Sequence, residues 1–426
     1  MHRRRLILIC WALLCGAPDL SAQRLSPLAP VPDWRELEAF QETITRAEFV
    51  QLLDTVYAPG EAARGVITVG ETEATMLTSL TPPAEWRLRF AAESKAPPRS
   101  WRPASALGPA PAERPLAGVK IALDPGHLGG AWAKMEERWF QIGLSQPVVE
   151  GELTLRVAEL LAPQLRALGA EVTLVRDHLG PTTPERPATL EAAARAELAR
   201  QGISTPRATY TPGQTGPERT ETVQWQSELL FYRISEIRHR ARIVNEQLKP
   251  DLVLCLHFNA EGWGGDPLNP ELVPRNHLHI LVNGCYATDE LRFDDQRHDL
   301  LLKLLNRSYA EELAISERVA GVVATTASLP PYRYTTPNAR QTGTSPYVWA
   351  RNLLANRLYR APVVFLEPYV MNSEEIWARV QAGEYEGERL VAGVLRKSLT
   401  REYADAVATG LAEYYRSARP AAQVPK

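Results

Sequence analysis

VKIALDPGH, at residues 119–127, indicates the fold class of this chain. Five mainly apolar residues predict a buried strand, and an Asp-Pro-Gly turn ends it directly before His127. Leucine and valine then recur on one face of a predicted helix at 152–168, which Gly169 ends, and a second strand is expected at 171–176. A strand, a helix and a strand in this order are typical of an α/β domain with a largely parallel sheet.

The same alternation continues toward the C-terminus. Helices are expected at 228–248 and 403–415, and apolar strands at 252–257, 278–282 and 361–366. We therefore expect an α/β fold over residues 116–415, in which a mostly parallel twisted sheet is flanked by helices.

Two stretches interrupt this alternation, at 177–222 and 284–351, and we interpret them as insertions. Loops longer than roughly 12 to 15 residues in a compact domain are usually functional or mobile. We expect both insertions to frame a substrate groove. Residues 416–426 are expected to form a loose tail.

The N-terminus resembles a cleaved signal peptide over residues 1–22. Arg3, Arg4 and Arg5 precede an apolar run at 6–15, and small residues close the segment. The run is about half of the roughly 20 residues that a membrane-spanning helix needs. We expect an exported protein of the periplasm, the extracellular space or the cell wall, with no membrane span after cleavage. An uncleaved N-terminal anchor is the alternative.

A small N-terminal module of unknown role is expected at 23–93, with a helix at 46–54 and strands at 65–69 and 86–90. Residues 94–115 carry six prolines without a helical or strand period, which is typical of a stiff, extended linker. The catalytic region is therefore expected to begin at residue 116.

Composition excludes some functions. The 426 residues contain 48 Lys+Arg and 50 Asp+Glu, which gives a net charge of -2, so neither nucleic acid nor an anionic membrane is indicated as a partner. Two of the four cysteines lie in the leader, which leaves Cys255 and Cys285 in the mature chain. They can pair in an oxidising compartment or pack as free thiols.

Candidate site residues lie where strands end, because the carboxyl ends of parallel strands form the ligand site in such sheets. His127 follows the first strand, Glu150 begins the first helix, His257 ends the strand LVLCLH and Glu367 ends the strand PVVFLE. Two imidazoles and one carboxylate leave a fourth tetrahedral position for water, which is the ligand set of a catalytic zinc site. A lone histidine would mean little, but the combination indicates a metal site.

These residues stand in motifs that resemble the zinc-dependent N-acetylmuramoyl-L-alanine amidases of the amidase type 3 family. The similarity covers most of residues 116–415. Its motifs are VKIALDPGH at 119–127, EGELTL at 150–155, RARIVN at 240–245 leading into DLVLCLHFNA at 251–260, and PVVFLE at 362–367 continuing to Asn372.

The resemblance implies a phosphorylase/hydrolase-like α/β fold and one Zn²⁺ held by His127, Glu150 and His257. It implies that Glu367 transfers the proton. The chain departs from the family at 368–372, where PYVMN replaces a GFLSN-like turn, and in the stretch after His127, so its substrate preference is expected to differ.

Several assignments stay open at this point. Glu152 lies two residues from Glu150, and the register of the family favours Glu150 as the ligand. His277 and His279 share one face of a strand and are an alternative metal pair, or they face an insertion. Asp124 can hold the His127 imidazole or stabilise the turn.

Asn259 and Arg240 are further candidates to support the ligands or contact the substrate. Glu367 itself could act in proton transfer, as a fourth zinc ligand, or in an ion pair with Arg357 or Arg360.

The resemblance implies hydrolysis of the amide bond between N-acetylmuramic acid and L-alanine in peptidoglycan. Such an enzyme would serve cell-wall remodelling, daughter-cell separation or recycling, with peptidoglycan as its partner and a regulatory or wall-anchoring protein as a second one. The alternatives are a zinc peptidase that acts on the stem peptide and a catalytically inactive wall-binding or amidase-regulating protein.

Overall fold

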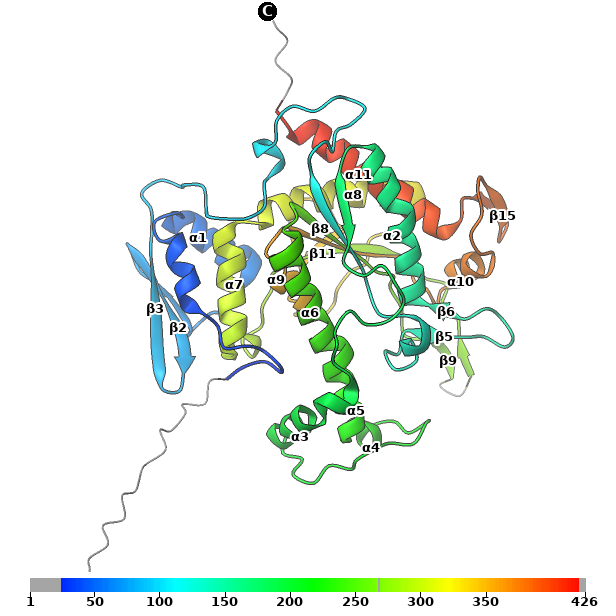
Figure 1. Cartoon of the computed structure of the whole chain (residues 1–426), viewed down its shortest axis with the longest axis horizontal. Coiled ribbons are helices and arrows are strands. Elements are labelled where there is room, and N and C mark those ends of the chain that lie inside the picture. Colours follow the sequence, from blue (N-terminus) through cyan, green and yellow to red (C-terminus); the bar gives the residue numbers. More distant parts are fainter. Residues whose placement is uncertain (1–23, 267–268, 421–426) are drawn as a thin grey trace, which may run out of the picture.

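The computed structural model describes residues 24–266 and 269–420, so the predicted signal peptide lies outside the described residues. Within them, the main sheet has seven strands in the order β12-β13-β11-β14-β8-β4-β7 (Figure 1). Their bounds are β4 Lys120–Pro125, β7 Glu171–Leu174, β8 Leu252–Leu256, β11 Leu278–Val282, β12 Arg340–Gln341, β13 Val348–Ala350 and β14 Val363–Pro368. The predicted α/β fold class is confirmed.

The sheet is parallel from β7 through β4 and β8 to β14. Strand β11 then runs antiparallel to β14, whereas β13 is parallel to β11. This reversal places the start of β11 beside the end of β14, so that His279 lies opposite Glu367 in the register. The first residues of β11 therefore lie at the same edge of the sheet as the last residues of the parallel strands.

Helices cover both faces of the sheet. The longer helices α2 (Glu150–Ala167), α8 (Tyr309–Ala327) and α11 (Leu399–Ala418) pack on the face that carries residues such as Leu123, Leu254 and Leu366. On the other face, α6 (Glu236–Arg242) and α9 (Leu354–Leu358) cover Cys255 and Phe365. Because neighbouring strand residues point to opposite faces, the fully apolar strands are buried on both sides.

The long helix expected at 228–248 is one continuous helical rod from residue 223 to 248. It consists of α5 (Val223–Leu229), a π-helical segment at Leu230–Ser235, α6 and a second π-helical segment at Ile243–Leu248. The rod projects beyond the sheet, and α3 (Glu191–Arg200) and α4 (Pro217–Thr220) lie near its first turns (Figure 1).

The segment 284–351 corrects one expectation, because most of it is not a loop at the rim of a groove. It contains α7 (Asp294–Asn306) and the whole of α8, and α8 packs against α11, β11 and β14 in the core. Apolar residues such as Leu304 and Val319 recur at helical spacing and are fully buried. In α7, buried leucines alternate with charged residues that are also buried. This mixture hides the apolar helical pattern in the sequence.

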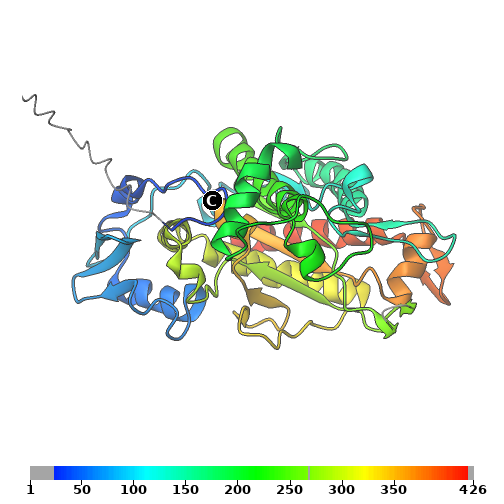
Figure 2. The ribbon, with the colours of Figure 1, turned by 90° about the horizontal axis from the view of Figure 1, so that it is seen from below.

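The N-terminal module forms a three-stranded antiparallel sheet of β1 (Ile67–Val69), β2 (Glu73–Leu80) and β3 (Pro83–Arg89). Its helix α1 (Arg46–Leu52) is capped by the Thr45 hydroxyl and continues as a π-helical segment at Leu53–Tyr57. The module lies at one end of the molecule, against α7 (Figures 1 and 2).

Two backbone hydrogen bonds of 2.7 Å, from Cys285 to Val56 and from Tyr286 to Tyr57, join the module to the rest of the chain. The proline-rich stretch after the module is extended but buries Trp101 and Leu107. The division of the chain at residues 93 and 115 stays a prediction.

The remaining short elements lie at the end of the molecule opposite the N-terminal module (Figure 2). They are β5 Trp139–Phe140, β6 Val148–Val149, β9 Gly264–Asp266, β10 Asn269–Glu271, α10 Glu374–Gln381, β15 Arg389–Val391 and β16 Val394–Arg396. Helix α11 continues through Ala418, into the predicted tail.

Both cysteines of the described chain, Cys255 and Cys285, are buried free thiols. They belong to different hydrophobic clusters, so packing accounts for each of them. None of the helices in the described ranges combines the length and apolar composition needed to cross a bilayer.

Candidate metal centre

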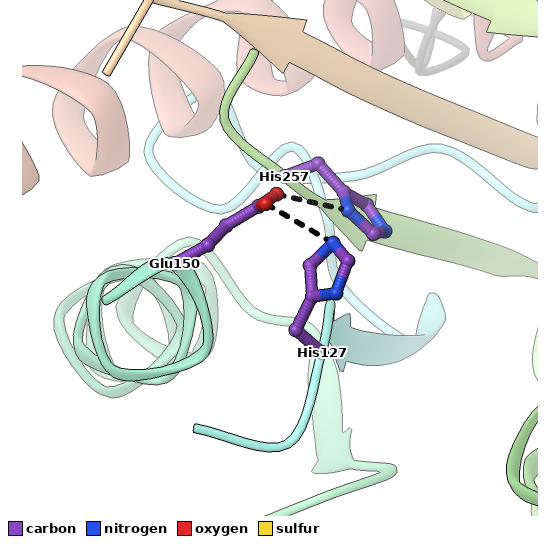
Figure 3. A group of neighbouring side chains, drawn as sticks. All are labelled: His127, Glu150 and His257. Carbon is purple, nitrogen blue, oxygen red and sulfur yellow. Dashed lines mark hydrogen bonds and ion pairs between the residues drawn. The ribbon is translucent and has the colours of Figure 1, made fainter. Parts of the chain in front are cut away.

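Three side chains converge at the carboxyl edge of the sheet. His127 follows β4, His257 follows β8, and Glu150 is the first residue of α2. The Glu150 carboxylate faces both imidazoles from one side (Figure 3), with Oε2 3.1 Å from Nε2 of His127 and Oε1 3.3 Å from Nδ1 of His257. One ligand atom from each residue lies within 4.8 Å of the other two, so the group could hold a metal ion.

Local backbone geometry makes this approach possible. His127 has a left-handed φ of 61°, which turns the chain sharply after Gly126. A Cβ on Gly126 would lie 2.2 Å from Cε1 of His257, so only glycine leaves space for the ring. On its other side the ring stacks on Phe365, with centroids 4.3 Å apart. The His257 imidazole is therefore held between a bare backbone and an aromatic ring.

Beneath the turn, a buried network holds the backbone of the first ligand. Arg240 donates to Asp124 Oδ1 at 2.9 Å, to the Pro125 carbonyl at 2.7 Å and to the His127 carbonyl at 3.0 Å. Glu236 accepts from the same guanidinium at 2.7 Å. The described residues show no contact between Asp124 and the His127 ring, so this carboxylate supports the turn through Arg240.

Two residues that sequence reasoning did not single out contact the ligands. Glu136 is 2% exposed, lies 3.5 Å from Nδ1 of His127 and accepts the backbone N–H of Leu128 at 2.8 Å. Arg138 lies 3.2 Å from Oε2 of Glu150. Both come from the stretch after His127 that departs from the family pattern, where no periodicity marks them as functional.

The second acidic candidate, Glu152, lies away from the metal centre. Glu152 is exposed on α2, whereas Glu150 is 2% exposed and also accepts the backbone N–H of Phe258 at 3.1 Å. The structure therefore brings Glu150, and not Glu152, to the two imidazoles.

The ionisable groups of the centre shift one another's pKa values. Burial lowers the pKa of His127, but the Glu150 carboxylate and Glu136 outweigh it and raise the pKa to about 9. Burial raises the pKa of Glu150, and the His127 charge and hydrogen bond reverse this and lower it well below its usual range. Burial lowers the pKa of His257. Without a metal, His127 is therefore protonated at neutral pH, and a metal ion that binds there must displace this proton.

Glu367 lies at the end of β14, beside the three ligands. Burial, together with the Glu150 charge, raises its pKa to about 8. Among the described residues, its carboxylate has no hydrogen-bond or ion-pair partner. Arg357 pairs with Asp299 and Arg360 with Glu36, so the predicted ion-pair alternative for Glu367 is wrong. Glu367 is also outside the three-residue ligand group.

A polar cavity of about 320 Å³ opens beside these groups. His127, Arg138 and Glu150 line it on the metal side, and Tyr332, Tyr334 and Arg351 come from the end of the segment 284–351. Residues 177–222, all of which the structure describes, contribute nothing to the lining. Leu190 and Leu198 pack onto the projecting helical rod and onto Leu128, which follows His127, and the expected place of this segment at the rim of the groove stays a prediction.

The alternative histidine pair is divided between two environments. His279 lines the cavity, with Nε2 3.1 Å from the Tyr334 hydroxyl, whereas Nε2 of His277 lies 2.9 Å from Glu261. Burial lowers the pKa of His279 to about 3, so it is a neutral ring. Neither residue joins a group of three candidate metal ligands among the described residues. The Asn259 amide lies 3.4 Å from Nδ1 of His279 and also lines the cavity.

The atypical turn after Glu367 is built into the core. Tyr369 has a φ of 61°, is fully buried and donates its hydroxyl to Glu402 at 3.0 Å. The Asn372 side chain accepts the N–H of Glu261 at 3.0 Å and donates to its carbonyl at 2.8 Å. The tyrosine ring therefore fills the interior and leaves the cavity open.

No protein-family model and no curated protein matches this chain. Solved structures that overlap with it include several N-acetylmuramoyl-L-alanine amidases. Ami1 from Mycobacterium smegmatis is 16% identical, over 71% of this chain and 99% of its own, with a TM-score of 0.37. AmiC2 of Nostoc punctiforme is 14% identical, over 70% of this chain and 99% of its own, with a TM-score of 0.36.

The CwlD amidase from Clostridioides difficile, solved in complex with the GerS lipoprotein, is 12% identical to this chain. The overlap covers 70% of this chain and 100% of that chain, with a TM-score of 0.38. At these values the overlaps by themselves assign no activity to the chain.

Proposed function

We propose that this protein is a zinc-dependent hydrolase that cleaves the amide bond between N-acetylmuramic acid and L-alanine in peptidoglycan. The observation that carries the proposal is the convergence of His127, Glu150 and His257 beside a polar cavity, with Glu367 next to them. Each of these residues stands in a motif that resembles the zinc amidases of the amidase type 3 family.

The donor set fits zinc. Two imidazole nitrogens and one carboxylate oxygen match the three protein ligands of catalytic zinc sites, whereas calcium and magnesium prefer oxygen ligands alone. Glu136 beside Nδ1 of His127 and Arg138 beside Glu150 orient these ligands in the way that outer partners do in metal sites. Zinc held there would lower the pKa of a bound water to about 7 and polarise the scissile carbonyl.

Glu367 supplies the proton transfer in this proposal. Its carboxylate has no protein partner among the described residues, so in its ionised form it is free to accept a proton from the attacking water. It then donates that proton to the departing L-alanine nitrogen, which leaves as an amine. Burial and the Glu150 charge raise the pKa of Glu367 to about 8, and the positive charge of zinc would lower it toward neutrality, so that the group can do both.

Export fits this substrate, because peptidoglycan lies outside the inner membrane. The leader at residues 1–22 remains the basis for the proposed periplasmic or extracellular location. A regulatory or wall-anchoring partner remains a prediction.

The test is hydrolysis of purified sacculi by the mature protein, residues 23–426, with identification of the products by mass spectrometry. An amidase releases intact stem peptides that begin with L-alanine, and a chelator abolishes the release until zinc is restored. A stem-peptide peptidase would leave L-alanine on the muramic acid. Zinc-loaded protein that releases nothing would indicate the wall-binding or regulatory alternative.

Variants of the ligands make the same test specific. His127→Ala and His257→Ala are expected to lose stoichiometric zinc and all hydrolysis. His178→Ala is the matched control, because His178 is exposed and pairs only with its neighbour Asp177 among the described residues. Normal zinc content in both ligand variants would overturn the assignment.

A further inference from the structure

Arg351 brings a positive charge to the cavity wall without an acidic partner. It follows β13, is half-buried, and lines the cavity together with Tyr334. Its Nη1 donates to the Tyr334 hydroxyl at 3.3 Å, and the guanidinium lies over that ring, 5.5 Å from its centroid. Among the described residues, no carboxylate lies within ion-pair distance of Arg351.

This arrangement differs from that of the other arginine of the cavity. Arg138 is paired with Glu150 at 3.2 Å, whereas most of the five N–H donors of the Arg351 guanidinium have no acceptor in the described chain. Partial burial of a charged group costs solvation free energy unless an opposite charge pairs with it. The cavity therefore presents a guanidinium that is prepared for an anion from outside the protein.

The position of Arg351 separates it from the reacting bond. Strand β13 is three places from β8, which His257 follows, in the order β13-β11-β14-β8. Neighbouring strands lie about 4.8 Å apart, so β13 and β8 are separated by roughly 14 Å at the sheet. Arg351 lines the same cavity as Glu367, whose strand β14 is two places from β13, or roughly 10 Å, which corresponds to about two or three extended peptide residues at about 3.5 Å each.

Between these two ends, a chain of contacts links the groups. His279 stands opposite Glu367 across β11 and β14, and its ring contacts Tyr334, which in turn contacts Arg351. A substrate whose scissile amide lies beside Glu367 would extend past His279 to reach the guanidinium. The guanidinium would thus meet the substrate two or three residues away from the scissile bond.

We propose that Arg351 is a specificity residue that binds a free carboxylate of the stem peptide near the scissile bond, with Tyr334 positioning the guanidinium. The planar fork of arginine matches the two oxygens of a carboxylate, and a single guanidinium balances a single negative charge. This inference rests on the proposed function and deepens it, because it selects acidic stem peptides over their amidated counterparts.

The test compares two substrates, N-acetylmuramoyl-L-alanyl-D-glutamate and its diamide, with the zinc-loaded wild-type protein and three variants. The wild type is expected to prefer the acid by roughly 10- to 100-fold in kcat/KM, as for a charge-assisted hydrogen-bonded pair. In Arg351→Gln this ratio is expected to fall to near one, and Arg351→Lys, which keeps the charge but not the fork, should retain part of it.

Arg333→Gln is the matched control, because Arg333 lies between the two cavity tyrosines in sequence but is exposed and outside the lining. It should keep the wild-type ratio. A wild type that treats the two substrates alike, or an Arg351→Gln variant that slows both by the same factor with unchanged zinc content, would overturn the proposal.

A binding measurement separates this inference from the proposed activity. Calorimetry with the dipeptide L-alanyl-D-glutamate and its diamide needs no turnover. If neither substrate is hydrolysed, the proposed function fails, but weaker binding of the dipeptide to Arg351→Gln than to the wild type still supports the carboxylate site. Equal binding of the dipeptide to both proteins would refute it.

Discussion

Replacing Gly126 by alanine is expected to disable the metal centre while the protein stays folded. The new Cβ would lie 2.2 Å from Cε1 and 2.5 Å from Nδ1 of His257. Ordinary contact begins near 3.4 Å, so the ring must retreat by about 1.2 Å. Gly126 is absent from the residues with positive φ, so alanine adopts this backbone without strain and the effect comes from the contact alone.

The ring has no room for that movement. Phe365 stacks on its far side with an interplanar angle of 14°, and Nδ1 is engaged with Glu150 (Figure 3). Metal sites tolerate ligand displacements of about 0.2 Å, which is several times less than the shift required. We therefore expect zinc affinity to fall by at least about 100-fold, the upper end of what lost ligand support costs.

The measurement is a competition titration of zinc against a chelator, with thermal unfolding of the same samples as a check on the fold. Gly262→Ala is the control, since a Cβ there meets nothing within 4 Å although Gly262 lies close in sequence to Ala260 of the cavity lining. It should bind zinc as the wild type does. A folded Gly126→Ala protein with wild-type zinc affinity would show that the reasoning about His257 is incorrect.

Three further predictions concern single carboxylates and one histidine. Glu150→Gln should lose most of its zinc, whereas Glu152→Gln should keep it, as measured by metal analysis; the reverse result would move the ligand to Glu152. Glu367→Gln should retain zinc and lower kcat by roughly 10²- to 10⁴-fold, and loss of zinc instead would make Glu367 a ligand. Burial opposes protonation of His298, but its contacts with Asp299 and Glu36 raise the pKa to about 9. The stability from this proton, about 3 kcal/mol at most, is complete below about pH 6.5 and declines as the pH rises through 9, so unfolding curves of the wild type and His298→Gln should converge over that interval.

Much of the main sheet and the metal ligands could be predicted from local patterns. Strands β4, β8 and β14 are apolar runs bounded by turn residues, and each ends next to one of the polar residues of the centre. In a parallel sheet such ends meet at one edge whatever the order of the strands. That His127 and His257 share one edge therefore required no knowledge of the strand order, whereas their proximity follows from the pairing of β4 with β8.

Other parts of the site depended on contacts between distant segments. The reversal of β11 brings His279 opposite Glu367, but an apolar strand has the same pattern in either direction. The burial of Glu136 against His127 depends on how a loop without periodicity folds back, and no local signal marks it. The aromatic residues of 332–334 reach the cavity only because α7 and α8 leave the following segment beside β11.

Local sequence therefore specifies which residues end the strands, because the alternation of side chains and the turn residues act over a few positions. The burial of Glu150, the unpaired carboxylate of Glu367 and the guanidinium of Arg351 on the cavity wall are decided only when the chain is packed. Burial and pairing of charge depend on what surrounds each group, and these surroundings come from strands and helices far apart in the sequence.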